Sequence, residues 1–194
     1  MSISRLSLLV LCVLPLLSRA EPEQAYASPE DLVNQFHQTI REAAQIDSTE
    51  ARYRELIRPV KSSFDWEIIS QAVLGKYWES MNVTLRIEFM DVFARHTAAT
   101  YADRFDSSRF QFRTVETQRL SAENRWLVTT ELIPSDQAAT EIKYVVEKSA
   151  ATSSIINVVA RGVSDLAIKR AEFSSIIEKE GYDQLIARLT ERIP

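Results

Sequence analysis

Cysteine, histidine and glycine are scarce in this 194-residue chain, which has one, two and three of them. The single cysteine, Cys12, lies in an apolar stretch near the N-terminus, so the chain after it can form neither a disulfide nor a thiolate site. Two histidines without a further cysteine make a poor zinc site. The sequence has no glycine-rich phosphate loop, Gly-x-Ser-x-Gly or His-Glu-x-x-His motif. The composition therefore gives little support to catalysis, and we expect no metal and no catalytic residue.

The first twenty residues have the pattern of a secretory signal peptide. Arg5 is followed by an apolar stretch over residues 6–17 and by a small-residue cleavage site that ends at Ala20. About twelve apolar residues are too few to cross a bilayer. We expect cleavage after Ala20, and the 174 residues that remain are enough for a single domain with its own core.

The charge balance argues against some partners. The whole chain has a net charge of −4, and removal of residues 1–20, with Arg5 and Arg19, changes it to −6. No run of basic residues is present. We therefore expect no nucleic-acid partner and no strong attraction to anionic lipid surfaces.

Apolar spacing divides the rest of the chain into three blocks. Residues recurring every three or four positions predict helices in the first block, at 28–43, 47–60, 64–74 and 82–104. From Phe110 the period changes to two, and strands are expected there and at 125–133, 141–148 and 154–163. The helical period then returns at 168–179 and 185–193. This order predicts an α+β fold, a twisted antiparallel sheet of about four to five strands with helices packed on it.

Gly75 lies just before two wide aromatic residues, Tyr77 and Trp78. A glycine used so sparingly favours a left-handed helix end. We expect Gly75 to end the third helix, with the two rings filling the corner before the long helix. Of the two histidines, His37 is expected to face water and His96 to be an interior histidine with satisfied hydrogen bonds.

Three stretches resemble a known family. They are FDWEIISQAVLGKYW, HTAATYADRFD and ARGVSDLAIKRAEFSSIIEKEGYDQLIARL. Together they resemble the MlaC family of periplasmic lipid carriers, also called toluene-tolerance or ABC-transporter auxiliary proteins, over residues 32–189. The ATYADRFD and KRAEF runs are most similar to the branch associated with hopanoid biosynthesis. Family members usually carry an aromatic residue and a Tyr-Asp pair where this chain has Ser154-Ile155-Ile156-Asn157.

The resemblance implies a function in lipid transport. Residues 21–194 would form one lipid-binding domain, with an apolar cavity between a curved sheet and its helices. The cavity would hold phospholipid acyl chains, with the headgroup at its mouth and no other cofactor. The partners would be an inner-membrane ABC transporter complex and an outer-membrane lipoprotein or porin complex, and the protein would act as a periplasmic monomer that maintains outer-membrane lipid asymmetry.

Several apolar positions are candidates for the cavity wall, although core packing is the simpler interpretation of each. The lipid-binding candidates are Trp78, Phe89, Phe93, Tyr101, Val128, Tyr144, Val146, Val158, Phe173 and Ile177. Lys169 and Arg170 are candidates for contact with a phosphate at the mouth, and solvated helix charges are the simpler interpretation of both.

Two other functions remain open on the sequence alone. A small enzyme with a cone-shaped pocket would need His96 or a buried aspartate with a strongly shifted pKa in that pocket. A docking module would have a filled interior. A carrier would have a roomy apolar cavity, and an unrelaxed one of roughly 600 Å³ would destabilise the empty protein by on the order of 14 kcal/mol.

Overall fold

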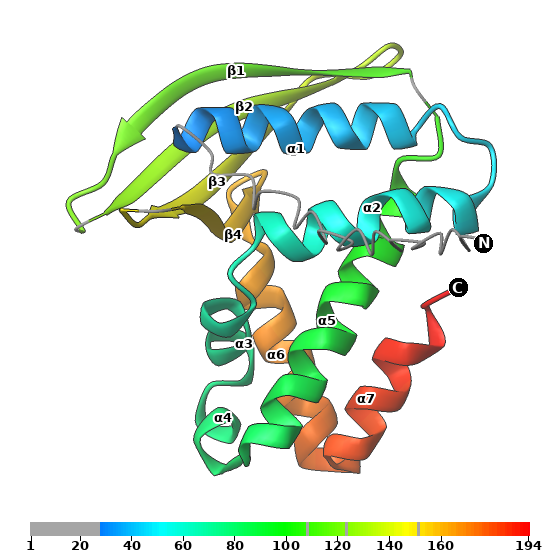
Figure 1. The fold of residues 1–194 in the computed structure, drawn as a ribbon, viewed down its shortest axis with the longest axis vertical. Helices are drawn as coiled ribbons and strands as arrows, with labels where there is room; N and C mark the ends of the chain where they lie inside the picture. The colour runs from blue at the N-terminus through cyan, green and yellow to red at the C-terminus, as the bar shows by residue number, and fades with distance from the viewer. Residues whose placement is uncertain (1–27, 108, 123, 151) are drawn as a thin grey trace, which may run out of the picture.

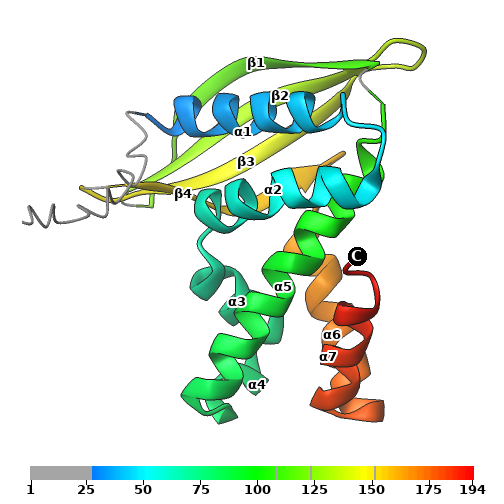
Figure 2. The ribbon, with the colours of Figure 1, turned by 45° about the vertical axis from the view of Figure 1, so that its right-hand side comes forward.

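The molecule has an arched sheet at one end and a stem of helices at the other (Figure 1). The computed structural model describes residues 28–107, 109–122, 124–150 and 152–194. The expected signal peptide at residues 1–20 lies outside them. Helix α1 (Pro29–Ala43) runs along the inner face of the sheet, and α2 (Thr49–Ser63) lies beneath α1 (Figures 1 and 2).

The sheet is an antiparallel meander, as the sequence predicts. Its strands pair in chain order and are β1 (Phe110–Arg119), β2 (Arg125–Pro134), β3 (Thr140–Lys148), β4 (Ser153–Ala160) and β5 (Val163–Ser164). The predicted strand at 154–163 is interrupted, because Arg161 and Gly162 have φ values of 54° and 77°. Two consecutive residues with positive φ make the tight turn that joins twisted strands, so β4 and β5 form a hairpin.

Two irregularities bend the sheet. The register shifts between Thr114 and Glu116 in β1, and again between Val145 and Val146 in β3. The second shift places Ile155 opposite Val146 and leaves Ile156 of β4 as the extra residue without a partner in the register. A bulge increases local twist and curvature, which lets the sheet arch over α1.

The first two helices begin at serine caps. The Ser28 hydroxyl accepts a hydrogen bond from the Asp31 amide at 3.1 Å, and Ser48, one residue after the expected start, caps α2 in the same way. A capping side chain satisfies an amide that the first helical turn leaves free. The apolar stripe of α1, which includes Phe36, is fully buried.

The stem consists of five helices. They are α3 (Trp66–Leu74), α4 (Lys76–Ser80), α5 (Val83–Arg104), α6 (Asp165–Glu180) and α7 (Tyr182–Glu191). The bounds of α3 and α5 agree with the sequence expectation, and Gly75 ends α3 with a φ of 54°. The short α4 was not expected, and α6 begins three residues early because Ser164 caps it. Among the described residues, no helix combines the length and apolar character that a membrane span requires.

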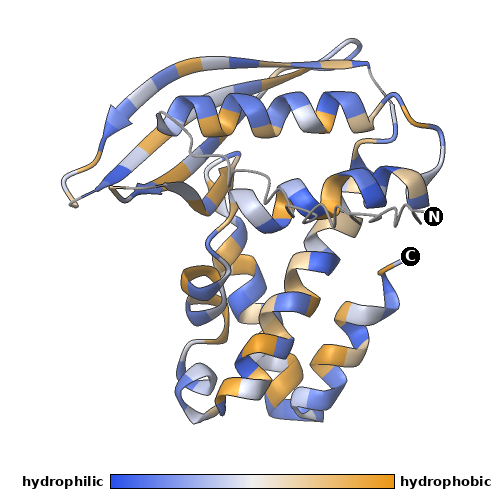
Figure 3. Cartoon of the chain, viewed as in Figure 1, coloured by the Kyte–Doolittle hydropathy of each residue, from blue (hydrophilic) through white to orange (hydrophobic). Residues whose placement is uncertain are grey.

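The long helix α5 is the axis of the stem. The sequence predicts one apolar side, whereas buried residues lie around much of its circumference, because α2, α3 and α7 pack on it and the Phe173 ring of α6 contacts it. Figure 3 shows hydrophobic residues concentrated where the stem helices face one another. At the centre, the Phe173 ring lies 6.1 Å from Phe89 and 5.4 Å from Phe93, measured between centroids.

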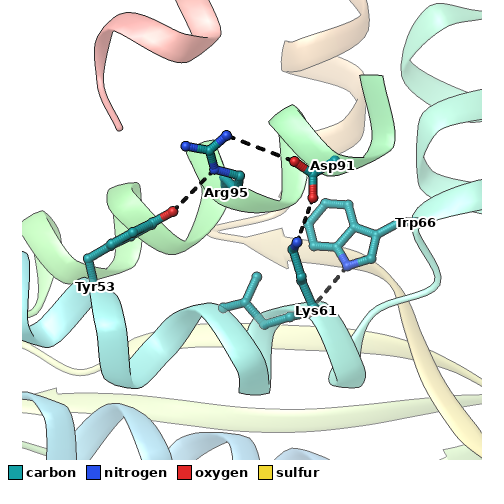
Figure 4. Close-up of polar contacts among 6 residues, drawn as sticks. Tyr53, Lys61, Trp66, Asp91 and Arg95 are labelled. Carbon is teal, nitrogen blue, oxygen red and sulfur yellow. Dashed lines mark hydrogen bonds and ion pairs between the residues drawn. The ribbon is translucent and has the colours of Figure 1, made fainter. Parts of the chain in front are cut away.

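Polar contacts at the surface fix α2 against α5 (Figure 4). Arg95 on α5 donates to the Tyr53 hydroxyl of α2 at 3.4 Å, and its neighbour Asp91 forms an ion pair with Lys61. The Trp66 indole donates to a backbone carbonyl near the end of α2 at 3.3 Å. The Arg95 and Asp91 contacts hold the middle of α5 against α2.

The prediction that His37 faces water is wrong. Its side chain is 1% exposed, its Nε2 lies 2.9 Å from the Tyr144 hydroxyl, and its ring stacks on Phe112 at 3.8 Å. The sheet covers more of α1 than its apolar stripe, so the residue after Phe36 is buried as well. Burial, with a smaller contribution from Arg41, lowers the pKa of His37 to about 3.

The prediction for His96 is confirmed. This histidine is 9% exposed, and its Nδ1 lies 3.0 Å from the Leu189 carbonyl of α7. The Tyr182 hydroxyl donates to the Leu85 carbonyl of α5 at 3.1 Å. Two hydrogen bonds thus attach the C-terminal helix to the stem axis.

Candidate functional site

A cavity of about 300 Å³ lies where the sheet meets the stem. Its walls come from the C-terminal half of α5, the end of β4, and the segment that runs from β5 into α6. The lining residues are Thr97, Thr100, Tyr101, Arg104, Val158, Ala160, Val163, Asp165, Ile168 and Lys169.

The Ser164 side chain fixes the side of the cavity that α6 forms. Its hydroxyl accepts a hydrogen bond from the Ala167 amide at 3.4 Å and donates to the Asn157 side chain of β4 at 3.0 Å. The hairpin turn at Gly162 brings Ser164 back to β4. The first turn of α6 is therefore held against the strand that forms the opposite wall.

Much of the inner wall is apolar. Val158 of β4 lines this wall. The Thr100 hydroxyl donates a hydrogen bond to the His96 carbonyl within α5 at 2.9 Å. A threonine that bonds back to its own helix contributes mainly its methyl group to the surroundings. Burial raises the pKa of the Tyr101 hydroxyl above its ordinary value. The wall therefore suits hydrocarbon better than a charged ligand.

Three charged side chains also line the cavity: Arg104, Asp165 and Lys169. The Lys169 ammonium lies 5.8 Å from the centroid of Phe93 and 6.0 Å from that of Phe173, in the gap between α5 and α6. Among the described residues, no ion pair involves any of the three.

Two exposed apolar side chains stand at the cavity. Val163 is 51% exposed and Ile168 is 54% exposed, although both line the cavity. Singly exposed apolar side chains are common on protein surfaces, but these two lie together beside a cavity. They make its open side partly apolar.

The cavity lies at the edge of the sheet and not beneath its middle. The space between α1 and the sheet is filled by aromatic side chains, including the buried Phe36, His37 and Tyr144. The Phe36 ring meets Phe64 at 5.2 Å and Tyr101 at 5.3 Å, both edge to face. Such rings pack to the density of a solid core, so the cavity lies beside them, between α5, α6 and the end of β4.

The predicted lipid contacts are distributed over three regions. Tyr101 and Val158 line the cavity, as does the predicted headgroup contact Lys169. The others are buried or half-buried in packed parts of the molecule: Phe89, Phe93, Phe173 and Ile177 in the stem, Val128, Tyr144 and Val146 under the sheet, and Trp78 in α4. Whether each of them contacts lipid stays a prediction.

Arg170, the second predicted headgroup contact, lies against Gly75 and is not among the cavity-lining residues. Sequence reasoning missed the charged side chains of Arg104 and Asp165. Thr97 and Thr100 follow the predicted wall residue Phe93 by four and seven positions, so helical spacing was a usable signal for the wall. Arg104 and Asp165 are 61 positions apart, and only the folded chain places them at one opening.

The described residues contain no group of three or more histidine, cysteine, aspartate or glutamate side chains arranged to hold a metal ion. Both histidines make hydrogen bonds within the core, to Tyr144 and to the Leu189 carbonyl. The cavity is thus a mainly apolar recess with a charged rim, suited to binding an amphiphile.

Comparison with protein families identifies the class to which this fold and recess belong. The family model described as MlaC protein matches residues 30–191, and the chain belongs to the MlaC family. A search of curated protein sequences gave no match.

A solved structure has the same fold. It is the phospholipid-binding protein from Ralstonia solanacearum, determined in complex with a phospholipid. The two chains are 17% identical, with a TM-score of 0.71 over 87% of this chain and 96% of the other. This confirms the α+β fold expected from the sequence.

Proposed function

We propose that this protein is a periplasmic lipid carrier that holds phospholipid acyl chains in the cavity between α5, α6 and β4. The observation that carries the proposal is a recess with apolar walls and a charged rim in a member of the MlaC family. The phospholipid complex of the structural neighbour supports it by analogy of fold.

Hydrocarbon burial supplies the driving force. Each methylene gains about 0.8 kcal/mol on leaving water, so two sixteen-carbon chains represent on the order of 25 kcal/mol. When empty, the cavity of about 300 Å³ leaves apolar wall in contact with water, and that exposure has a free-energy cost. A bound chain removes that cost, which favours a protein that leaves its source membrane loaded.

The cavity volume is half of the 600 Å³ assumed from the sequence and lies at the lower end of the range for ligand sites. It takes part of a diacyl lipid. We therefore expect α5 and α6 to separate further when a whole phospholipid is bound. The two helices meet through side chains, with the Lys169 ammonium between them, so such a movement breaks no backbone pairing.

A carrier needs no catalytic group, and we propose that this protein is not an enzyme. An enzyme that used this cavity would need a group of polar side chains there, including an acid or base with a shifted pKa. Burial lowers the pKa of His96. Its Nδ1, however, is hydrogen-bonded to the Leu189 carbonyl, and His96 is not among the residues that line the cavity. The recess equally disfavours a docking module with a filled interior.

Family membership supports the wider role. We propose that the loaded protein crosses the periplasm between an outer-membrane lipoprotein or porin complex and an inner-membrane ABC transporter complex. The energy of the transporter would set the direction. The run from Ala99 to Asp106, which resembles the hopanoid-associated branch, contains the lining residues Tyr101 and Arg104, so we include hopanoid-related lipids among the candidate ligands.

Filling the cavity tests the proposal. Ala160 is exposed and lines the cavity, whereas its neighbour Val159 points to the other face of β4 and does not line it. Ala160→Trp is expected to abolish retention of lipid during purification, as measured by mass spectrometry of organic extracts, while Val159→Trp retains it. Equal lipid content in the two variants, both folded by circular dichroism, would rule out this cavity as the lipid site.

A further inference from the structure

The cavity mouth carries charges of both signs. Arg104 comes from the last turn of α5 and Asp165 from the first turn of α6. Lys169 follows Asp165 by four positions, so the two lie on the same side of α6, which descends from the sheet alongside α5 (Figure 2). All three side chains line the same cavity, so two cations and one anion surround one opening.

These charges do not neutralise one another. An aspartate and a lysine four positions apart on a helix commonly pair, yet no ion pair joins Asp165 to Lys169. The Lys169 ammonium instead lies over the rings of Phe93 and Phe173, at 5.8 and 6.0 Å. A cation over aromatic faces is partly withdrawn from water, and its charge stays available to a ligand.

The other two charges lie near the Tyr101 hydroxyl. The Asp165 carboxylate adds to the effect of burial in raising the pKa of Tyr101, whereas the Arg104 guanidinium acts in the opposite direction. Both groups are therefore close enough to the inner wall to act on a ligand whose chain lies against Tyr101. A headgroup at this mouth meets all three charges.

We propose that this mouth recognises a zwitterionic phospholipid headgroup that carries both a phosphate and a primary amine. The phosphate lies between Arg104 and Lys169, whose N–H groups suit phosphate oxygens, and the ammonium lies against Asp165. A headgroup with a phosphate and a neutral polyol leaves the Asp165 carboxylate without a cation. The inference rests on the proposed function, because the cavity must first hold the chains.

A competition between two lipids measures this preference. Purified protein freed of its lipid is mixed with vesicles that contain equal amounts of phosphatidylethanolamine and phosphatidylglycerol with the same acyl chains. Native mass spectrometry then gives the ratio of the two complexes. Because the ammonium and Asp165 meet at an exposed rim, a preference of roughly two- to fivefold for phosphatidylethanolamine is expected.

Matched variants on α6 assign the preference to the mouth. Asp165→Asn is expected to remove it while binding of phosphatidylglycerol persists, and Glu172→Gln, exposed on the same helix but not lining the cavity, is expected to keep it. Lys169→Gln is expected to lower the occupancy of both lipids. Lys179→Gln, which changes the same charge farther along α6, is expected to lower neither.

The possible outcomes distinguish headgroup recognition from the proposed lipid binding on which it depends. Preference for phosphatidylethanolamine that disappears in Asp165→Asn but not in Glu172→Gln supports the headgroup site. Equal binding of the two lipids, or a preference unchanged by Asp165→Asn, overturns the headgroup site and leaves lipid binding established. Failure of the unaltered protein to bind either lipid overturns both.

Discussion

The Arg170 guanidinium lies directly over Gly75. A Cβ atom built on Gly75 would stand 2.7 Å from the Arg170 Nη2 and 3.0 Å from its Cζ. Nearby, Glu178 accepts hydrogen bonds from Lys76 at 3.1 Å and from the Tyr77 hydroxyl at 2.9 Å. The residues between α3 and α4 therefore pack directly against α6. Helix α6 in turn forms one wall of the cavity.

Replacement of Gly75 by alanine is expected to destabilise the protein by about 1–3 kcal/mol, because its φ of 54° and ψ of −122° suit glycine almost alone. The midpoint of urea unfolding measures the change. The same replacement in an Arg170→Ala background separates backbone strain from the clash with the guanidinium. We expect most of the loss to remain there, and a full recovery would contradict the assignment to backbone strain.

The buried pair of His37 and Tyr144 makes stability depend on pH. The pKa of His37 is lowered to about 3 in the folded protein, against about 6.5 in the unfolded chain, so only the unfolded chain takes up a proton between those values. Stability is therefore present above pH 6.5 and is lost as the pH falls. Between pH 6.5 and pH 5 we expect the free energy of unfolding to drop by about 1.5 kcal/mol from this group.

His37→Gln tests that dependence, since glutamine still bonds to Tyr144 but does not titrate. The variant is expected to have a flatter dependence of unfolding free energy on pH over the same range. His96, whose pKa is also lowered by burial, contributes with the same sign and remains in the variant. An unchanged slope in His37→Gln would show that His37 titrates normally in the folded state.

Arg52 fastens the sheet layer to the stem. Its side chain is 3% exposed and donates to the Ala102 carbonyl of α5 at 2.7 Å and to the carbonyls of Ile46 and Asp47 at 2.7 and 2.9 Å. Removal of the guanidinium leaves these acceptors without their donor, so Arg52→Met is expected to cost about 2–4 kcal/mol. Chemical denaturation measures it. Arg54→Met, on an exposed residue of the same helix, should cost below about 1 kcal/mol.

The apolar side chains at the mouth are expected to set the rate of loading. Replacement of both Val163 and Ile168 by serine removes apolar surface that a chain would touch on entry, and we expect uptake of a fluorescent phospholipid from vesicles to slow by roughly three- to tenfold. Stopped-flow fluorescence follows the rate. The same change at Val83 and Ile87, which are 70% and 59% exposed at the far end of α5, should leave the rate unaltered; equal slowing would refute a role for the mouth.

Much of the fold could be read from local sequence. Ser28, Asp65 and Asn82 each accept a hydrogen bond from the amide three positions on, and a cap of that kind depends on neighbouring residues only. The turn at Arg161 and Gly162 was missed because an arginine at positive φ has no sequence signal comparable to glycine. The five-residue α4 is too short for its apolar spacing to show.

The candidate site was less accessible from sequence. Its apolar members, such as Tyr101 and Val158, follow periodic patterns, but the same patterns describe Phe93 and Val146, which lie in the packed core. The spacing of apolar residues indicates which face of a helix or strand is buried. It does not indicate whether a side chain or a ligand buries that face. Burial of His37 likewise depends on how far the sheet extends over α1, which is a property of the assembled layers.

The mass of the natively purified protein tests the central claim most directly. Protein isolated from the periplasm without detergent is measured by native mass spectrometry, and its lipid is then extracted and identified. We expect the mass of the chain to be increased by that of one bound phospholipid, which organic extraction removes. A chain that is always free of lipid, and that takes up none when offered phospholipid vesicles, would contradict the account.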